Sequence, residues 1–466
     1  MLRKLSFLIM ILPVLMLAGC ASVDFAAEAE SSLMAGDYDH ALKTVEKEKE
    51  SSHYKGKNSL LYYLDYGFLC HYAGLYEESN KALDIAERLG EELYARSISR
   101  EIGTYLINDK VREYAGEEFE LLYVHIFKCL NYIALNNTED ALVEVRKANL
   151  RMEILEQKYR EATDEYNASA DAGARVPQAD CHFHNSAISR YLGTILFRTD
   201  RAFDDARIES EWLERAFAEQ SYVYDFPLPD LPAVREPSDK ALLNIVSFTG
   251  LCTVKRPLGF IATTGPDWIS FSAIGQSDEY TANLLGFTIL PAFGLQDNGI
   301  IRFEIPIMDD RWDSLDQIVV RITGADGKEV NLELLEKMNN ISRDTYKRKM
   351  PLVIIKTALR VIGKKVGGEV GSHAIGNATD NNALGLLSGL LFDAVSAATE
   401  GADTRCSLFL PAFASTSEIE LDPGIYDISI EYYQNGVCML VDNRPGVSVE
   451  KGKLNLLESF RFQVER

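Results

Sequence analysis

The sequence is short of positive charge. It holds 48 lysine and arginine residues against 70 aspartate and glutamate residues, which gives a formal net charge of −22. A field of this sign repels the phosphate groups of nucleic acids and of anionic lipids, so neither is an expected partner. Any attachment to a membrane therefore has to come from a separate anchor.

Long hydrophobic runs are absent beyond the first 20 residues. No later segment reaches the ~18 uninterrupted apolar residues that indicate a membrane-spanning helix. The nearest candidate, residues 383–398, contains Asp393 and is shorter than the ~20 residues that cross a bilayer. With 47% hydrophobic and 25% charged residues, the composition is that of a folded chain.

Recognisable catalytic motifs are also absent. The chain has no Gly-x-Ser-x-Gly nucleophile elbow, no Walker loop and no His-Glu-x-x-His pair. Ser52 and Lys55 match a Ser-x-x-Lys pattern, but they lie in a polar linker and the partner motifs of that pattern are missing. We therefore predict that the protein is not an enzyme.

Metal-ligating residue types occur without the spacing of a metal site. Residues 181–184, Cys-His-Phe-His, offer three adjacent ligands, and no second cluster follows to complete a tetrahedral site. A group of aspartates around Trp312 lacks the alternating oxygen ligands and the glycine of a calcium loop. These are Asp309, Asp310, Asp313 and Asp316. No metal or other cofactor is expected.

Seven cysteines are widely scattered and form no short framework spacing. Cys70 and Cys129 lie in apolar helical patterns, where a free cysteine acts as a small buried hydrophobe. The six cysteines other than Cys20 would permit disulfides in an oxidising compartment. A bridge between Cys406 and Cys438, on neighbouring strands, stays open as an alternative.

The N-terminus carries the pattern of an export signal. Arg3 and Lys4 precede an apolar stretch over residues 5–16, and small residues follow. We expect a signal peptide over residues 1–19. The alternative to a lipidation signal is an ordinary secretory signal with a chance cysteine after it.

Residues 17–20, Leu-Ala-Gly-Cys, resemble the lipobox of bacterial lipoproteins. The resemblance implies cleavage between Gly19 and Cys20, a diacylglycerol on the Cys20 thiol and an acyl chain such as palmitate on the new amine. Several chains on one residue anchor firmly, because each buried methylene contributes ~0.8 kcal/mol. The lack of aspartate at Ala21 and Ser22 implies sorting to the outer membrane, with the protein facing the periplasm.

Residues 63–89 resemble a tetratricopeptide repeat. Gly67 and Ala86 stand where the paired helices of that repeat approach each other closely. Gly74 stands at the turn between the helices, where a left-handed backbone favours glycine. The segment therefore predicts a helical hairpin.

Weaker copies of this pattern begin at Gly36 and Asn136, and a last copy covers residues 192–206. An extra helix has to intervene before the copy at Asn136. We predict an irregular tetratricopeptide-like solenoid of hairpins over residues 20–225. A generic helical bundle is the alternative.

The concave face of such a solenoid typically binds peptides or partner proteins. Tyrosine suits this role, because its ring gives apolar contact and its hydroxyl gives a hydrogen bond. Packing between the hairpins is the alternative role for each residue. The candidate partner-binding residues are Tyr62, Tyr66, Tyr72, His125 and Tyr132.

A segment with four prolines, residues 226–237, predicts a stiff linker. Beyond it the hydrophobic period becomes alternating, which predicts a β-rich, sandwich-like domain over residues 238–466. Asn435-Gly436 and Asp326-Gly327 each separate two such segments, the signature of a β-hairpin. The expected strands cover residues 242–251, 300–307, 317–323, 408–413 and 418–421.

A helical insertion at about residues 340–400 interrupts the expected sheet. Lys356, Arg360 and Lys364 recur every four residues, so they form a basic stripe on a helix over residues 346–365. The stripe belongs either to a surface that meets a membrane or a partner, or to an amphipathic helix covering the sheet, and we favour the second. The expected fold is α+β and multidomain.

Three short segments resemble a group of bacterial tetratricopeptide-repeat-containing envelope lipoproteins: residues 139–149, 403–412 and 421–428. The resemblance implies an envelope scaffold and supplies no catalytic residues. The leading hypothesis is a membrane-anchored scaffold that binds envelope proteins in envelope assembly, secretion or control of cell-wall synthesis. The alternatives are an envelope hydrolase with a site in the C-terminal half and a subunit of a surface or export complex.

Overall fold

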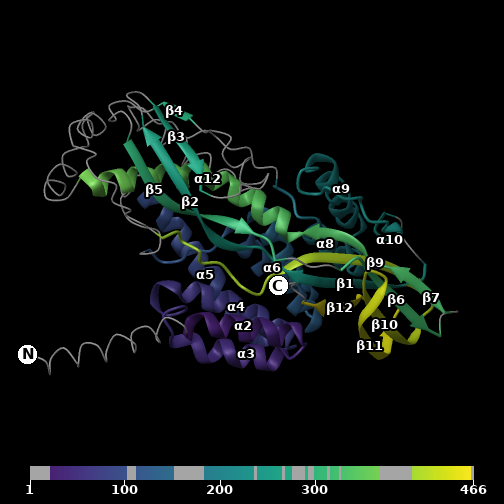
Figure 1. Ribbon diagram of the computed structural model, residues 1–466. Helices are drawn as coiled ribbons and strands as arrows, with labels where there is room; N and C mark the ends of the chain where they lie inside the picture. The colour runs from purple at the N-terminus through teal and green to yellow at the C-terminus, as the bar shows by residue number, and fades with distance from the viewer. Residues whose placement is uncertain are drawn as a thin grey trace, which may run out of the picture.

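The computed structural model describes residues 21–101, 112–151, 183–235, 239–264, 268–274, 289–291, 299–311, 315–324, 327–366 and 401–462. The chain is a mixture of helices and sheets, so the expected α+β class is confirmed (Figure 1). Several expected features lie outside the described residues. These are the signal peptide 1–19, Cys20, residues 181 and 182 of the Cys-His-Phe-His motif, and the segment 383–398.

The N-terminal part is built from paired helices. The pairs are α2 (Ala21–Met34) with α3 (Tyr38–Lys47), α4 (Ser59–Tyr72) with α5 (Tyr76–Glu101), and α8 (Ala187–Thr199) with α9 (Phe203–Glu219). α6 (Glu118–Ala134) is followed by a helix that starts at residue 138 and is described to residue 151. Short helical turns cover Glu48–Glu50, Gly56–Asn58 and Pro232–Arg235, the last being α10.

These four helix pairs close with the same turn. The backbone has a positive φ at Gly36 (77°), Gly74 (73°), Asn136 (57°) and Arg201 (60°). In each turn the next N–H donates to the carbonyl five positions earlier, over 2.8 to 2.9 Å. This left-handed cap satisfies the last carbonyls of the first helix and reverses the chain. The turns lie where the sequence predicted them at positions 36, 74 and 136.

Close packing between α4 and α5 depends on Gly67. A Cβ atom there would lie 2.5 Å from Leu83 Cδ2, well inside van der Waals contact. The Gly67 carbonyl accepts a hydrogen bond from Ser79 Oγ at 2.7 Å. A larger residue at position 67 would therefore require Leu83 of α5 to shift, which is consistent with the close helix approach that the repeat-like spacing predicted.

The described β-rich part forms three four-stranded sheets. The first has the order β12 (Asn455–Arg461), β1 (Ala241–Leu251), β9 (Pro411–Leu421) and β8 (Glu333–Lys337), and β1 pairs with β12 in parallel. The second has the order β11 (Val437–Val449), β10 (Gly424–Gln434), β6 (Gln317–Thr323) and β7 (Lys328–Asn331). The third has the order β4 (Ile289–Pro291), β3 (Trp268–Ala273), β2 (Val254–Thr264) and β5 (Gly299–Asp309).

The helical insertion begins with α12 (Met338–Val366), which packs along β5 (Figure 1). Its first half is anchored in the core by Ile341, Met350 and Ile354. Packing on a sheet is the role that the sequence favoured for this helix. The side chains of the basic stripe lie outside the described set.

The β10–β11 hairpin turns at Asn435 and Gly436, with φ values of 51° and 75°. Two positive φ values give the turn that matches the twist of the strands, so this hairpin prediction is confirmed. Cys438 is exposed at the start of β11, whereas Cys406 is buried, and both are free. The disulfide between them, kept open from the sequence, is therefore wrong. Cys70 and Cys129 are free and buried, as predicted.

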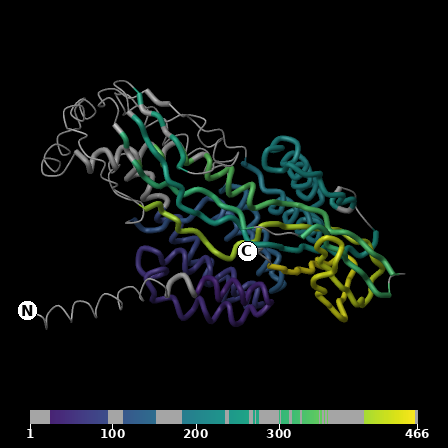
Figure 2. Tube along the Cα trace, viewed as in Figure 1, coloured from purple at the N-terminus to yellow at the C-terminus, as the bar shows by residue number. Residues whose placement is uncertain are grey.

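One apolar core joins the helices to the sheets. It includes helix residues such as Phe68 and Phe127 and sheet residues such as Phe248 and Ile305. Leu231, in the Pro-rich segment, is buried in the same core. The purple N-terminal helices and the yellow C-terminal strands accordingly contact each other (Figure 2). A second, smaller core lies between the first and second sheets.

Candidate functional site

The candidate partner-binding residues lie in different environments. Tyr62 is buried and stacks on the half-buried Tyr66, with ring centroids 5.4 Å apart. Tyr132 is half-buried, while Tyr72 and His125 are buried. The structure therefore brings only Tyr62 and Tyr66 together, and it turns Tyr72 and His125 toward two polar clusters inside the molecule.

Tyr72 faces a segment of the same chain, residues 401–410, which leads into β9. Its hydroxyl donates to the Phe409 carbonyl at 2.8 Å. Burial raises the pKa of the Tyr72 hydroxyl well above its ordinary value, so it stays protonated and donates. Residues 401–410 have no helix or strand of their own, so their backbone groups are open to such contacts.

Asp65, two turns before Tyr72 on α4, binds the same segment. Its Oδ1 accepts from Ser407 Oγ at 2.6 Å and from the Leu408 N–H at 2.9 Å. Its Oδ2 accepts from the Tyr54 hydroxyl at 2.9 Å. Burial raises the pKa of Asp65 to about 7, although these three hydrogen bonds lower it. The carboxyl group therefore titrates near neutral pH.

Glu120, in the first turn of α6, binds the segment from the other side. Its carboxylate accepts from the Ser407 N–H at 2.6 Å and from the Tyr114 hydroxyl at 2.6 Å. It also accepts from the Glu117 N–H at 2.7 Å, which caps the helix. Burial, together with the nearby Glu117 charge, raises the pKa of Glu120.

Glu117 differs from its neighbour because it meets cations. Its carboxylate contacts the ammonium groups of Lys255 and Lys349, the latter at 3.0 Å. Burial raises the pKa of Glu117, but the two ammonium groups outweigh burial and lower the pKa to about 2. This group ties α6 to β2 and α12.

Two arginines complete the binding of residues 401–410. Arg405 donates to Asn58 Oδ1 and to the Arg112 carbonyl, both at 2.9 Å. Arg311 donates to the Leu408 carbonyl at 2.7 Å. The helices thus hold an irregular stretch of chain through its backbone groups and through the side chains of Ser407 and Arg405. The bound stretch belongs to the protein itself.

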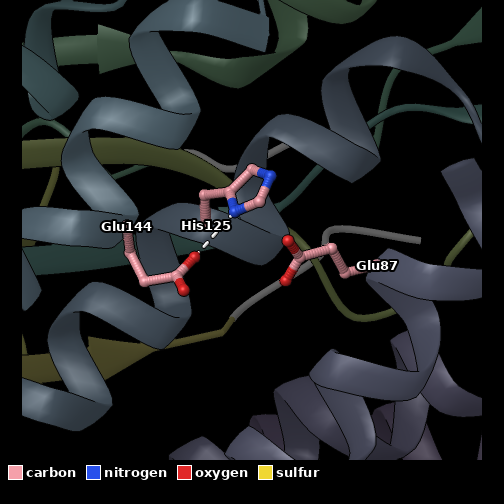
Figure 3. Close-up of side chains that lie close together, drawn as sticks. All are labelled: Glu87, His125 and Glu144. Atoms are coloured by element: carbon pink, nitrogen blue, oxygen red, sulfur yellow. Dashed lines mark hydrogen bonds and ion pairs between the residues drawn. The ribbon is translucent and has the colours of Figure 1, made fainter. Parts of the chain in front are cut away.

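His125 belongs to a second polar cluster, formed by α5, α6 and the helix that starts at residue 138. Its Nδ1 lies 2.7 Å from Glu144 Oε2, and the Glu87 carboxylate lies close to both side chains (Figure 3). One ligand atom from each of the three residues lies within 4.8 Å of the others. This spacing is compatible with a metal ion.

The Lys128 ammonium occupies this cluster. Its Nζ lies 2.6 Å from Glu87, 2.7 Å from Asp84 and 2.9 Å from Glu144. Lys147 Nζ lies 2.9 Å from Glu87 and 3.2 Å from Glu144. Burial lowers the pKa of Lys128, but the carboxylates outweigh burial and raise it, so the ammonium stays charged. Two ammonium groups repel a divalent cation, so these residues do not fit a metal and form a salt-bridge network.

Glu336 of β8 is a further buried carboxylate, and it joins a sheet to two helices. It accepts from the Tyr224 hydroxyl at 2.9 Å, from Ser186 Oγ at 2.9 Å and from the Ile188 N–H at 3.2 Å. The Tyr123 hydroxyl is a further donor. Burial raises the pKa of Glu336. Its contacts with the first turn of α8 place it at the electropositive end of that helix.

The described aspartates around residue 312 do not converge. Asp309 and Asp310 form ion pairs with different arginines, and Asp316 accepts from the Asn435 N–H at 2.6 Å. Asp313 lies outside the described residues.

No protein-family model matches this chain, and no curated protein or solved structure matches it. Among the described helices, none is both long and apolar enough to cross a bilayer.

Sequence reasoning missed the buried carboxylates that hold the helices to the sheets. A signal for two of them was present, because Asp65 and Glu120 each stand within an apolar helical run, Leu-Leu-Tyr-Tyr-Leu-Asp and Phe-Glu-Leu-Leu-Tyr-Val. A lone acidic residue in such a run is buried only when it is hydrogen-bonded. Glu336 gave no comparable signal, because Glu333 and Lys337 flank it in a charged strand.

Proposed function

We propose that the protein is a lipid-anchored scaffold of the bacterial cell envelope, which faces the periplasm from the outer membrane and binds partner proteins without catalysing a reaction. The observation that carries the proposal is Leu-Ala-Gly-Cys at residues 17–20. A lipidated Cys20 would stand shortly before the first helical hairpin, α2 and α3, and would hold this hairpin near the membrane surface.

We also propose that the helix pairs form a tetratricopeptide-like solenoid and that the first and second sheets form a sandwich. The repeated left-handed cap of the four hairpins and the close approach at Gly67 support the solenoid. The core shared by the two sheets supports the sandwich. The helices hold residues 401–410 of the same chain much as tetratricopeptide repeats hold a peptide, which also supports the solenoid.

The partner surface that we favour is the start of β11, because residues 401–410 already fill the inner face of the helices. Residues 437–441, Val-Cys-Met-Leu-Val, are all exposed, from 60% at Val437 to 42% at Val441. β11 is an edge strand of its sheet. The opposite edge, β7, is short and carries Lys328 and Glu329, the kind of charge that protects an edge. An exposed apolar run on one edge alone is typical of a binding surface.

The occupant of this surface is a partner protein with an uncharged, apolar patch. Residues 434–441 carry no charge in a chain of net charge −22, so a partner meets no like charge there. The pairing of β10 with β11 shifts between Tyr432 and Tyr433, which bulges β11 at Met439. A bulge interrupts the regular backbone edge, so the partner would be recognised through side chains.

The anchor is tested by comparing the native protein with Cys20→Ala. Mass spectrometry of the native protein should give a mature chain that begins at residue 20 and carries acyl chains. Membrane fractionation should recover the native protein with the membranes and lose Cys20→Ala from them. Retention of Cys20→Ala in the membrane fraction would remove the anchor from the proposal.

The scaffold is tested by crosslinking in intact envelopes. The native protein, Met439→Lys and the matched control Ile425→Lys are compared; Ile425 lies on β10, is 75% exposed and is outside the 437–441 run. The proposal expects a defined partner captured by the native protein and Ile425→Lys and lost in Met439→Lys. Equal capture by all three proteins contradicts the surface, and no capture by the native protein contradicts the scaffold.

The burial and the internal hydrogen bonds of three carboxylates support the proposal that the protein does not catalyse a reaction. Asp65, Glu120 and Glu336 are fully buried, and their oxygens accept hydrogen bonds from the chain itself. Activity of the purified protein on peptidoglycan or ester substrates would favour the hydrolase alternative.

A further inference from the structure

His71 is a buried histidine that joins three elements from distant parts of the sequence. It lies on α4 and its side chain is fully buried. Its Nδ1 lies 2.6 Å from Asn131 Oδ1 on α6, and its Nε2 lies 3.0 Å from Glu458 Oε2 on β12. Both ring nitrogens therefore have an oxygen partner, and the partners decide where the protons are.

The orientation of the Asn131 amide is fixed by its other contacts. Its Nδ2 lies 2.9 Å from Asn80 Oδ1, which can only accept a hydrogen bond. The same Nδ2 lies 2.8 Å from Ser79 Oγ, which donates its own proton to the Gly67 carbonyl and so accepts from Asn131. Both N–H groups of the amide are thus used on that side. The atom that faces His71 is the carbonyl oxygen, and His71 Nδ1 has to donate.

The second nitrogen faces a carboxylate. The Glu458 side chain is 12% exposed, so it reaches solvent at one edge. An ionised carboxylate only accepts hydrogen bonds, so His71 Nε2 has to donate as well. A histidine that donates from both nitrogens is an imidazolium.

We infer that His71 donates from both ring nitrogens in the folded protein, as an imidazolium, and that this latches β12 to the helices through the contacts with Asn131 and Glu458. This goes beyond the proposed function and does not depend on it. Removing the proton would turn one of the two charge-assisted hydrogen bonds into a clash of acceptors. The latch is therefore a proton-sensitive contact between the first helices and the C-terminal strand.

Three aromatic rings surround the His71 ring. Phe127 and Phe460 lie with their ring planes nearly perpendicular to it, with centroid distances of 4.8 and 5.5 Å, and the Tyr76 centroid lies at 5.6 Å. These contacts hold the imidazole in place between Asn131 and Glu458.

Other polar groups around the ring come from each neighbouring element. They are Tyr72 on α4, Tyr76 on α5 and Glu458 on β12. Arg444 of β11 donates to the Glu458 backbone carbonyl at 3.5 Å and is paired with Asp442 at 2.9 Å, so the Glu458 carboxylate is the charged group that contacts the His71 ring.

The test is nuclear magnetic resonance of the protein labelled with ¹⁵N in its seven histidines. The His71 signals are assigned by their loss in His71→Gln. At neutral pH the inference expects both ring nitrogens of His71 to carry a proton. One unprotonated ring nitrogen would overturn it.

Glu458→Gln provides a second test that does not depend on how His71→Gln folds. Without the carboxylate, the His71 ring should lose one proton at neutral pH. The amides of β12 should then exchange about tenfold faster, the factor expected for loss of a charge-assisted hydrogen bond. The matched control is Glu450→Gln, an exposed residue paired with Lys453, which should leave the His71 signals unchanged. A ring that stays doubly protonated in Glu458→Gln would also contradict the latch.

Discussion

Two buried polar regions of this molecule hold their carboxylates in opposite ways. Around Lys128, the carboxylates Glu87 and Glu144 meet ammonium groups, and the pKa of each is lowered despite burial. Where the helices meet the sheets, Asp65 and Glu336 meet only hydroxyl and N–H groups, and the pKa of each is raised by burial. Burial is common to both regions, so the charge of the donors decides the direction. The first region needs its cations, whereas the second accepts a neutral group.

Lys128→Ala gives the largest expected effect, because it removes the cation from the first region. Asp84, Glu87 and Glu144 would then face one another with Lys147 as the remaining ammonium group and His125 bonded to Glu144. We expect a loss of about 5 kcal/mol in the free energy of unfolding, measured by denaturant titration. The vacated space should bind Zn²⁺ between Glu87, His125 and Glu144, so added Zn²⁺ should raise the melting temperature of the variant and not of the native protein.

Lys147→Ala is the matched control, because Lys147 is 40% exposed and pairs with two of the same carboxylates. Its loss should cost about 1 kcal/mol or less. Equal losses in the two variants would contradict a central role for Lys128.

Asp65→Asn tests the second region through the pH dependence of the free energy of unfolding. The pKa of Asp65 rises from 3.8 to about 7 on folding. The folded value is above the unfolded value, so the stabilising contribution is present below pH ~4 and is lost as the pH rises through ~7. Native protein should lose about 4 kcal/mol more than Asp65→Asn between these pH values, by the linkage of about 1.4 kcal/mol per pKa unit. Parallel curves of unfolding free energy against pH would contradict the raised pKa.

Glu144→Gln tests the opposite pH dependence, because the pKa of Glu144 is lowered in the folded protein. The pKa of Glu144 falls from 4.5 to about 2, because hydrogen bonding to His125 and the Lys128 charge outweigh burial. Its contribution is present above pH ~4.5 and is lost as the pH falls toward ~2. The native protein should lose about 3 kcal/mol over this range that Glu144→Gln, already less stable at neutral pH, does not lose. Acid unfolding followed by circular dichroism measures the difference.

Glu336→Gln gives the smallest expected effect. An amide keeps an oxygen that accepts from the α8 N-terminus, and the raised pKa indicates a site that tolerates a neutral group. We expect a loss of about 1 kcal/mol, against about 3 kcal/mol for Glu336→Ala, which leaves several buried donors without an acceptor. Equal losses measured by denaturant unfolding would show that the charge of Glu336 is required.

Features set by neighbouring residues could be predicted from the sequence. The turns at Gly36, Gly74 and Asn136, and the hairpin at Asn435-Gly436, each depend on a left-handed backbone that few residue types favour. The change from helical to alternating periodicity beyond residue 237 reflects the same local physics. These signals lie within a few residues of the structure they produce.

Features set by distant residues could not be predicted. Ser407 and Asp65 are 342 positions apart in the sequence, and no local pattern links them. The only sequence signal at residues 403–412 was their resemblance to a group of bacterial envelope lipoproteins. The sequence placed Tyr72 on the inner face of the helices but gave no sign that the chain itself would cover that face. The binding of envelope proteins by the helices stays a prediction, and the surface at residues 437–441 became visible only in the structure.

The parallel pairing of β1 with β12 has a consequence for the order of folding. The two strands stand at opposite ends of the β-rich region, and Leu243 is in register with Asn455. In a chain that emerges from its N-terminus, both sides of β1 stay unpaired until β9 appears, and one side stays unpaired until β12 appears. Such distant pairing makes folding slow, because a long loop has to close before the contact forms. During that interval the edges of β1 are unpaired, which is the kind of exposed strand that makes a folding intermediate prone to aggregation.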